Sequence, residues 1–165
     1  MGLVKQCSIG LIATLSLSFS FGWIQKTSAA ESRCQGASCK DKNPVEYGCD
    51  ADGSFVEQVI TTVYRWQDSW QPQQIIIEKT YSKSCNATWT RAYIPSETFL
   101  FIRDQAPING SEQIHGLFQA NGTGYFWSNS NMAPGRSVNQ ACVALQSIPL
   151  PGLGYLYDRH CTSFN

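Results

Sequence analysis

The sequence has few of the groups with which an enzyme carries out acid–base chemistry near neutral pH. It contains two histidines, His115 and His160, and histidine is the side chain that most readily titrates in that range. It lacks the G-x-S-x-G elbow of many serine hydrolases. His115 lies in an apolar, strand-like run and His160 precedes a cysteine, so we interpret both as structural or solvent-facing. These absences favour a protein that is not an enzyme.

Charge and long apolar runs are scarce as well. Charged residues make up 15% of the chain, with 12 basic and 12 acidic side chains. Such a balance gives no electrostatic footprint for nucleic acid or for an anionic membrane. One apolar run, residues 9–24, is long enough to suggest a membrane-related segment, and no second run could span a bilayer.

The N-terminal 30 residues are typical of an export signal. Lys5 precedes the apolar run, and Ser28-Ala29-Ala30 supplies the small residues of a cleavage site, so we expect cleavage after Ala30. A membrane anchor is the alternative, but serines and a threonine interrupt the run and no basic cluster follows it. Cys7 precedes the run and would leave with the signal. Residues 31–165 are then expected to form one domain, secreted or periplasmic.

Six cysteines follow the signal, and an even number in an exported chain predicts three disulfides and no free catalytic thiol. A zinc site in the first four is the competing interpretation; it is disfavoured because no C-x₂-C pair is present and the compartment is oxidising. We therefore expect no metal and no cofactor. The sequence leaves the pairing open, but near neighbours close most readily. On that ground we expect the pairs Cys34–Cys39, Cys49–Cys85 and Cys142–Cys161.

The chain after Gly53 is rich in β-branched and aromatic runs separated by Gly and Pro turns, and none of it shows a helical stripe. This pattern predicts an all-β fold, a small disulfide-stapled sandwich or barrel of about six to eight short strands. An irregular Cys-rich loop over 34–53 should precede the sheet. The expected strands are 56–66, 75–81, 88–94, 98–103, 115–119, 124–127, 140–146 and 154–161.

Part of the sequence resembles a known family. The shared residues are C-x-G-x-S-C from Cys34, Lys42-Asn43-Pro44, Gly48-Cys49 and the run Tyr81-Ser82-x-x-Cys85-x-Ala87-x-Trp89-x-Arg91. They resemble the bacterial exported domain-of-unknown-function family 2690, which includes YjfA-type secreted proteins. The resemblance covers a core at 34–103, with a looser extension at 104–165. It implies an extracytoplasmic β-rich domain and supplies no catalytic residues.

Aromatic side chains are the best candidates for a binding surface. Trp66 and Trp70 flank a polar hairpin tip, and Tyr125 and Trp127 lie beside Gly- and Asn-rich loops. Exposed aromatics in such places could form a platform for a sugar or a peptide. Ordinary cross-strand packing is the alternative. Trp89, close to Cys85, is instead expected to cover a disulfide in the core.

Acidic residues suggest two further possibilities. Asp50-Ala51-Asp52-Gly53 resembles the start of a calcium loop, but the rest of the pattern is missing, and a polar turn explains it as well. Asp50, Asp52 or Glu78 could serve a hydrolase if two carboxylates faced each other across a cleft. The tripeptides at Asn86, Asn109 and Asn121 match the N-glycosylation pattern, which has no meaning in a bacterial protein.

These observations predict an exported, non-enzymatic binding or structural module, with an envelope glycan or another extracellular protein as its partner. An extracytoplasmic hydrolase is the first alternative. The second is a secreted inhibitor or toxin-like protein whose rigid loop inserts into a partner, since rigidity lowers the ordering cost of binding.

Overall fold

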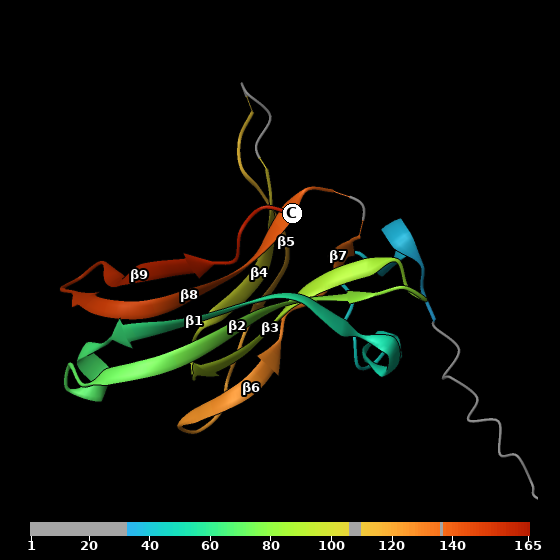
Figure 1. The fold of residues 1–165 in the computed structure, drawn as a ribbon. Coiled ribbons are helices and arrows are strands. Elements are labelled where there is room, and N and C mark those ends of the chain that lie inside the picture. Colours follow the sequence, from blue (N-terminus) through green and yellow to red (C-terminus); the bar gives the residue numbers. More distant parts are fainter. Residues whose placement is uncertain (1–32, 106–109, 136) are drawn as a thin grey trace, which may run out of the picture.

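The computed structural model describes residues 33–105, 110–135 and 137–165, which form two antiparallel β-sheets packed face to face (Figure 1). The expected signal at 1–30 and the tripeptide at Asn109 lie outside the described residues. The elements are η1 Gly36–Cys39, η2 Cys49–Asp52, β1 Ser54–Tyr64, η3 Trp66–Asp68, β2 Pro72–Ser82, β3 Ala87–Pro95, β4 Phe99–Asp104, β5 Gln113–Gln119, β6 Tyr125–Asn129, β7 Ala133–Pro134, β8 Asn139–Leu150 and β9 Gly154–Cys161.

The chain passes back and forth between the two sheets. The first sheet has the order β1-β2-β3-β6, with β7 also paired to β3, and the second has the order β5-β4-β8-β9. After β3 the chain crosses to the second sheet for β4 and β5, then returns to place β6 beside β3. The expected all-β sandwich is therefore confirmed. The described residues contain nine strands, one of them only two residues long.

The main core fills the space between the sheets. Alternation along each strand sends every second side chain inward, and the inward set is aliphatic. Full burial of each such Ile, Leu or Val contributes roughly 1.5–3 kcal/mol. The buried members are Val63, Ile75, Ile77, Ala92 and Ile94 from the first sheet, Leu100, Ile102, Ala141, Val143 and Leu145 from the second, with Ala120 and Ala133.

A second core lies under the Cys-rich loop. Trp89 and Met132 are buried there together with Ala87 and four cysteines. The six cysteines pair as Cys34–Cys39, Cys49–Cys85 and Cys142–Cys161, which is the pairing expected from near-neighbour closure. Trp89 covers the first two disulfides, as expected. The loop contains two short 3₁₀ turns, η1 and η2, in place of a fully irregular path.

The predicted hairpin between the first two strands is confirmed, but its first strand ends earlier than expected. β1 pairs antiparallel with β2 and stops at Tyr64, so Trp66 lies in the turn η3. Ser69 and Trp70 then adopt positive φ values of 52° and 60°. These two left-handed residues follow η3 and turn the chain back toward β2.

The penultimate strand, expected over 140–146, continues through Pro149 to Leu150. β8 pairs with β4 only as far as Ala144, and beyond that point it pairs with β9 alone, with Pro149 opposite Tyr155. One side of β8 is therefore unpaired at Pro149, and a proline without an N–H is tolerated on such an edge.

Helical structure is confined to single turns in the part of the chain that the structure describes. The three 3₁₀ elements have three or four residues each, and no helix there has the length and apolar character needed to cross a bilayer.

A pair of glycines tests the close packing where β5 meets the loop before β7. Gly116 and Gly124 have nearly the same φ, 63° and 65°, but a Cβ on Gly116 would lie 2.0 Å from the Asn131 carbonyl oxygen, whereas Gly124 faces open space. We expect Gly124→Ala to cost about 1–2 kcal/mol of unfolding free energy and Gly116→Ala about 3–5 kcal/mol. Urea denaturation of both variants measures the difference, and equal losses would contradict the packing described.

Candidate functional site

A groove of about 560 Å³ opens on the outer face of the first sheet, next to the Cys-rich loop. It is the larger of the two best-formed cavities among the described residues. Strand residues form its floor, and η2 with the start of β1 forms one wall. The lining residues are Asp50, Gly53, Ser54, Phe55, Glu78, Thr80, Trp89, Arg91 and Asn129.

Four polar residues cross the sheet in one line, and we call them the polar row: Gln58, Glu78, Arg91 and Asn129. The last three line the groove. Gln58 is opposite Glu78, Glu78 is opposite Arg91, and Arg91 is opposite Asn129. The row therefore contains one side chain from each of β1, β2, β3 and β6. All four point away from the aliphatic core, because each is out of phase with the inward residues of its strand.

Hydrogen bonds fix the middle of the polar row. The Arg91 guanidinium donates to Glu78 Oε2 at 2.8 Å, and the Gln58 amide donates to Glu78 Oε1 at 2.9 Å. Glu78 is buried and Arg91 is 45% exposed at the side chain. Both carboxylate oxygens of Glu78 are therefore occupied, while part of the Arg91 guanidinium remains open to the groove.

An apolar row lies directly beside the polar row and consists of Ile60, Ile76, Tyr93 and Trp127, again one residue from each strand. The Tyr93 and Trp127 ring centroids are 5.8 Å apart. The Arg91 guanidinium carbon lies 4.2 Å from the Trp127 ring centroid, within the range of a cation–π contact. Trp127 is 42% exposed, so its ring is fixed on one side and accessible on another.

Tyr125 extends this aromatic surface to the hairpin tip. Its ring is 6.0 Å from that of Tyr93, and its hydroxyl donates to Asp68 Oδ2 of η3 at 2.7 Å. Burial, followed by this hydrogen bond, raises the pKa of the Tyr125 hydroxyl well above its usual range. Tyr125 therefore acts as a neutral donor that ties β6 to the β1–β2 turn.

The four aromatic residues expected to bind divide into two groups. Tyr125 and Trp127 lie along β6, and Trp66 and Trp70 lie at the β1–β2 hairpin tip, 42% and 52% exposed. None of the four lines the groove, but Trp127 borders it because its ring packs against Arg91, a lining residue. Tyr125 lies farther from it and is hydrogen-bonded to Asp68 in the turn that contains Trp66. The structure therefore brings one of the four, Trp127, to the edge of the groove, and it adds Arg91 and Asn129, which sequence reasoning did not assign to binding.

Several polar atoms in groove residues are buried and unpaired. Among the described residues, seven buried side-chain nitrogen or oxygen atoms have no hydrogen-bond partner, and three of them belong to residues of this groove: Trp89 Nε1, Thr80 Oγ1 and Asn129 Oδ1. Trp89 is only 2% exposed. A buried polar atom without a partner costs about 1–3 kcal/mol, so hydrogen-bonding capacity is left unused beneath the surface of the groove.

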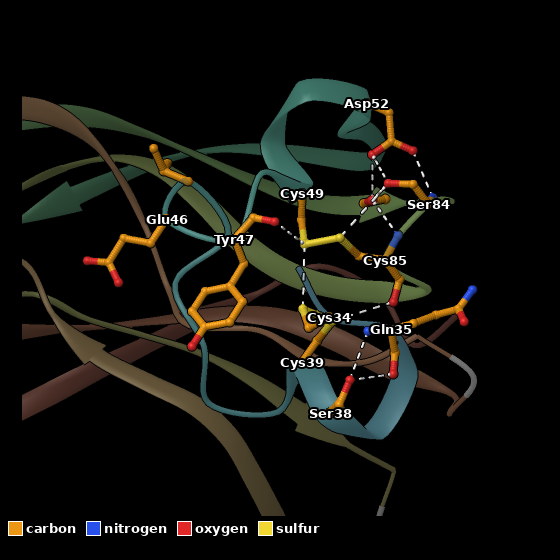
Figure 2. Close-up of a disulfide and its surroundings, with 12 residues drawn as sticks. Cys34, Gln35, Ser38, Cys39, Glu46, Tyr47, Cys49, Asp52, Ser84 and Cys85 are labelled. Carbon is orange, nitrogen blue, oxygen red and sulfur yellow. Dashed lines mark hydrogen bonds between the residues drawn. A yellow bond between two sulfur atoms is a disulfide. The ribbon is translucent and has the colours of Figure 1, made fainter. Parts of the chain in front are cut away.

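The loop wall of the groove is held by Asp52, Cys49 and Cys85 (Figure 2). The Cys49–Cys85 disulfide joins η2 to the turn after β2. The Asp52 carboxylate accepts hydrogen bonds from the Ser84 amide at 2.8 Å, from the Ser84 hydroxyl at 3.0 Å and from the Ser82 hydroxyl. Next to them, Gly53 packs so closely on Trp89 that a Cβ would lie 2.9 Å from the indole ring.

These contacts give the Asp50–Gly53 segment a structural explanation. Asp52, considered above as a calcium ligand or a hydrolase acid, uses both oxygens to hold the Ser82–Ser84 turn. Burial raises its pKa, but the hydrogen bonds from Ser82 and Ser84 outweigh that effect and lower the pKa overall. Asp50 lines the groove together with Glu78, so two of the three acids named for a hydrolase reach one cavity.

Both histidines lie away from this groove. His115 on β5 has its Nε2 atom 3.0 Å from Asp104 Oδ2 on the neighbouring strand. His160 on β9 is partly buried, and burial lowers its pKa despite the nearby Asp158. Both positions are on the second sheet, in keeping with the structural role expected for them.

Comparisons with protein-family models, with curated proteins and with solved structures find no match for this chain.

The Asp52 contacts predict a pH-dependent contribution to stability. Because the folded-state pKa of Asp52 is lowered, its contribution is present above its unfolded pKa of about 3.9 and is lost as the pH falls through the folded value. The carboxylate is solvent-exposed, so we expect Asp52→Asn to cost only about 0.5–1 kcal/mol at pH 7. Urea denaturation from pH 7 to pH 3 should show the difference from wild type shrinking.

Asp50→Asn is the matched control, because Asp50 lies in the same turn and its carboxylate makes none of these hydrogen bonds. Its stability should follow the wild type closely across the same pH range. A deficit in Asp52→Asn that stays constant from pH 7 to pH 3 would contradict the ionised-carboxylate account.

Proposed function

We propose that this protein is an exported binding module whose groove holds a segment of a glycan, or a chemically similar polyhydroxylated ligand. The observation that carries the proposal is the polar row beside the apolar row on one open sheet face. Planar amide and guanidinium groups bind pairs of adjacent hydroxyls, while an aromatic face packs on the C–H side of a sugar ring. Cavities with a few placed polar groups among apolar ones are typical ligand sites.

The charge of the groove favours a ligand without net charge. The lining residues include two carboxylates, Asp50 and Glu78, and one cation, Arg91. Arg91 is already paired with Glu78 at 2.8 Å. An anionic ligand would be repelled by these two carboxylates. Hydroxyl groups, in contrast, can both donate hydrogen bonds to the polar row and accept hydrogen bonds from it.

The hydrogen bonds that Glu78 already makes favour binding over hydrolysis. A glycosidase uses two carboxyl groups in separate roles, one as acid and one as base or nucleophile. Asp50 is available at the groove, but both oxygens of Glu78 are engaged by Arg91 and Gln58. The inhibitor-like alternative requires a rigid loop, and hydrogen bonds from Gly36 to Cys85 and between Asp41, Lys42 and Met132 do hold the Cys-rich loop rigidly on the domain. The chemistry of the groove is what favours glycan binding over that alternative.

Three disulfides place the folded chain in an oxidising environment. We extend this to secretion or a periplasmic location, with cleavage after Ala30 and an envelope glycan as the partner. Membership of the bacterial family 2690 belongs to the same proposal. Trp89 and Arg91, which are part of the shared motif, lie in the groove.

Substitutions in the two groups of aromatic residues test where the ligand binds. We expect Trp127→Ala to weaken binding of soluble envelope oligosaccharides roughly tenfold, because the variant loses the stacking face and the support of Arg91. Trp70→Ala, with a similarly exposed tryptophan at the hairpin tip, should change the dissociation constant less than about twofold. Isothermal titration calorimetry measures both, and a loss confined to Trp70→Ala would move the site to the hairpin.

An assay for hydrolysis separates the proposal from its alternative. The oxidised wild-type protein is expected to release no reducing ends from the same oligosaccharides during prolonged incubation. Saturable hydrolysis that is abolished in the near-isosteric variant Glu78→Gln would show that the groove is an active site and that binding is only its first step.

A further inference from the structure

The first two disulfides form a single cluster of sulfur atoms. The four Sγ atoms of Cys34, Cys39, Cys49 and Cys85 all lie within 4.8 Å of one another. Figure 2 draws the four side chains between the Cys-rich loop and the turn after β2. Cys34 Sγ is 3.8 Å from Cys49 Sγ although the two belong to different disulfides. All four cysteines are at most 8% exposed.

This spacing matches the requirements of a tetrahedral metal site. Zinc binds thiolate sulfur at about 2.3 Å, which places the four sulfurs of a tetrahedron about 3.8 Å apart. The contact between Cys34 and Cys49 already has that separation. Within each disulfide the sulfurs would have to separate by roughly 1 Å each to reach it, a displacement that side-chain rotation can supply.

The backbone around the cluster is fixed by interactions that do not involve the S–S bonds. The Gly36 amide donates to the Cys85 carbonyl at 2.7 Å, and the Cys49 amide donates to the Pro44 carbonyl at 2.8 Å. Trp89 and Met132 pack against the cluster as part of the same buried core. None of these interactions needs an S–S bond, so after reduction they still favour a closed loop in which the four sulfurs lie near one another.

We propose that Cys34, Cys39, Cys49 and Cys85, once reduced, form a four-thiolate site for zinc or a similar thiophilic divalent cation. A dithiol supplies two electrons and two protons to each disulfide and is itself oxidised to a disulfide. The metal then displaces the four thiol protons to solvent, because only the thiolate binds. In the oxidised protein the same sulfurs have no charge to offer, so the disulfides and the metal are mutually exclusive.

The two states close the same loop in different ways. Either the two disulfides or a metal ion would keep η1 and η2 packed over Trp89. Trp89 also lines the groove. The third pair, Cys142–Cys161, joins directly opposed residues of β8 and β9 on the other sheet. It offers only two sulfurs and provides an internal control.

Metal titration of the reduced protein tests the proposal. The full chain is reduced with a phosphine, which is oxidised to its phosphine oxide, and is then titrated with Co²⁺ followed by Zn²⁺ under anaerobic conditions. We expect one Co²⁺ per chain with the intense absorption of tetrahedral thiolate coordination, displaced by Zn²⁺. The oxidised protein should show no such absorption. Cys142→Ala/Cys161→Ala should behave as the wild type does, and Cys34→Ala/Cys39→Ala should lose the tetrahedral spectrum.

Thiol protection in the wild-type chain gives a second readout that needs no variant to fold. With Zn²⁺ present, alkylation of Cys34, Cys39, Cys49 and Cys85 should slow at least roughly tenfold, while Cys142 and Cys161 react freely, as peptide mass spectrometry can show. Absence of tetrahedral Co²⁺ binding, or protection that includes Cys142 and Cys161 equally, would overturn the proposal.

Discussion

The Cys49–Cys85 disulfide is the constraint on which the rest of this structure depends most. It joins a loop with little regular structure to the turn between β2 and β3, and the loop then covers one end of the outer face of the first sheet. Without that cover Trp89 would be an exposed tryptophan on a sheet surface. With it, Trp89 is buried beside two disulfides and also lines a groove. A cross-link that closes a loop of this length stabilises a domain by a few kcal/mol in the chain-entropy model, a substantial part of the net stability of a small domain.

The groove follows from two features of the sheet, the alternation of side chains along each strand and the register between strands. Alternation along each strand turns one set of residues, largely aliphatic, toward the second sheet and the other set outward. Antiparallel register then lines up the outward residues of four strands into a polar row and an apolar row. The ion pair between Glu78 and Arg91 fixes the centre of the polar row, and Trp127 supports the exposed side of Arg91. The proposed binding chemistry is a property of the rows, and no single residue carries it.

The sequence was informative wherever structure is local. β-branched runs, Gly and Pro turns and cysteine spacing predicted an all-β sandwich, the β1–β2 hairpin and the disulfide pairing. Trp89, Arg91 and Tyr93 could be placed on one face by alternation alone. The polar row could not be predicted, because Asn129 and Trp127 reach β3 through β6, which returns from the other sheet after more than one crossing. The prediction was wrong in extending β1 to Trp66 and in ending β8 at Gln146. A proline is tolerated in β8 because one side of the strand lacks a partner there, which depends on tertiary pairing.

The indole N–H resonances of the protein provide the most direct test of the groove as the binding site. Trp66, Trp70, Trp89 and Trp127 each contribute one such signal, and only Trp89 and Trp127 lie in or beside the groove. Titration of the oxidised, ¹⁵N-labelled protein with envelope oligosaccharides should shift the Trp89 and Trp127 signals in a saturable way and leave those of Trp66 and Trp70 in place. Saturable shifts confined to Trp66 and Trp70 would contradict the account.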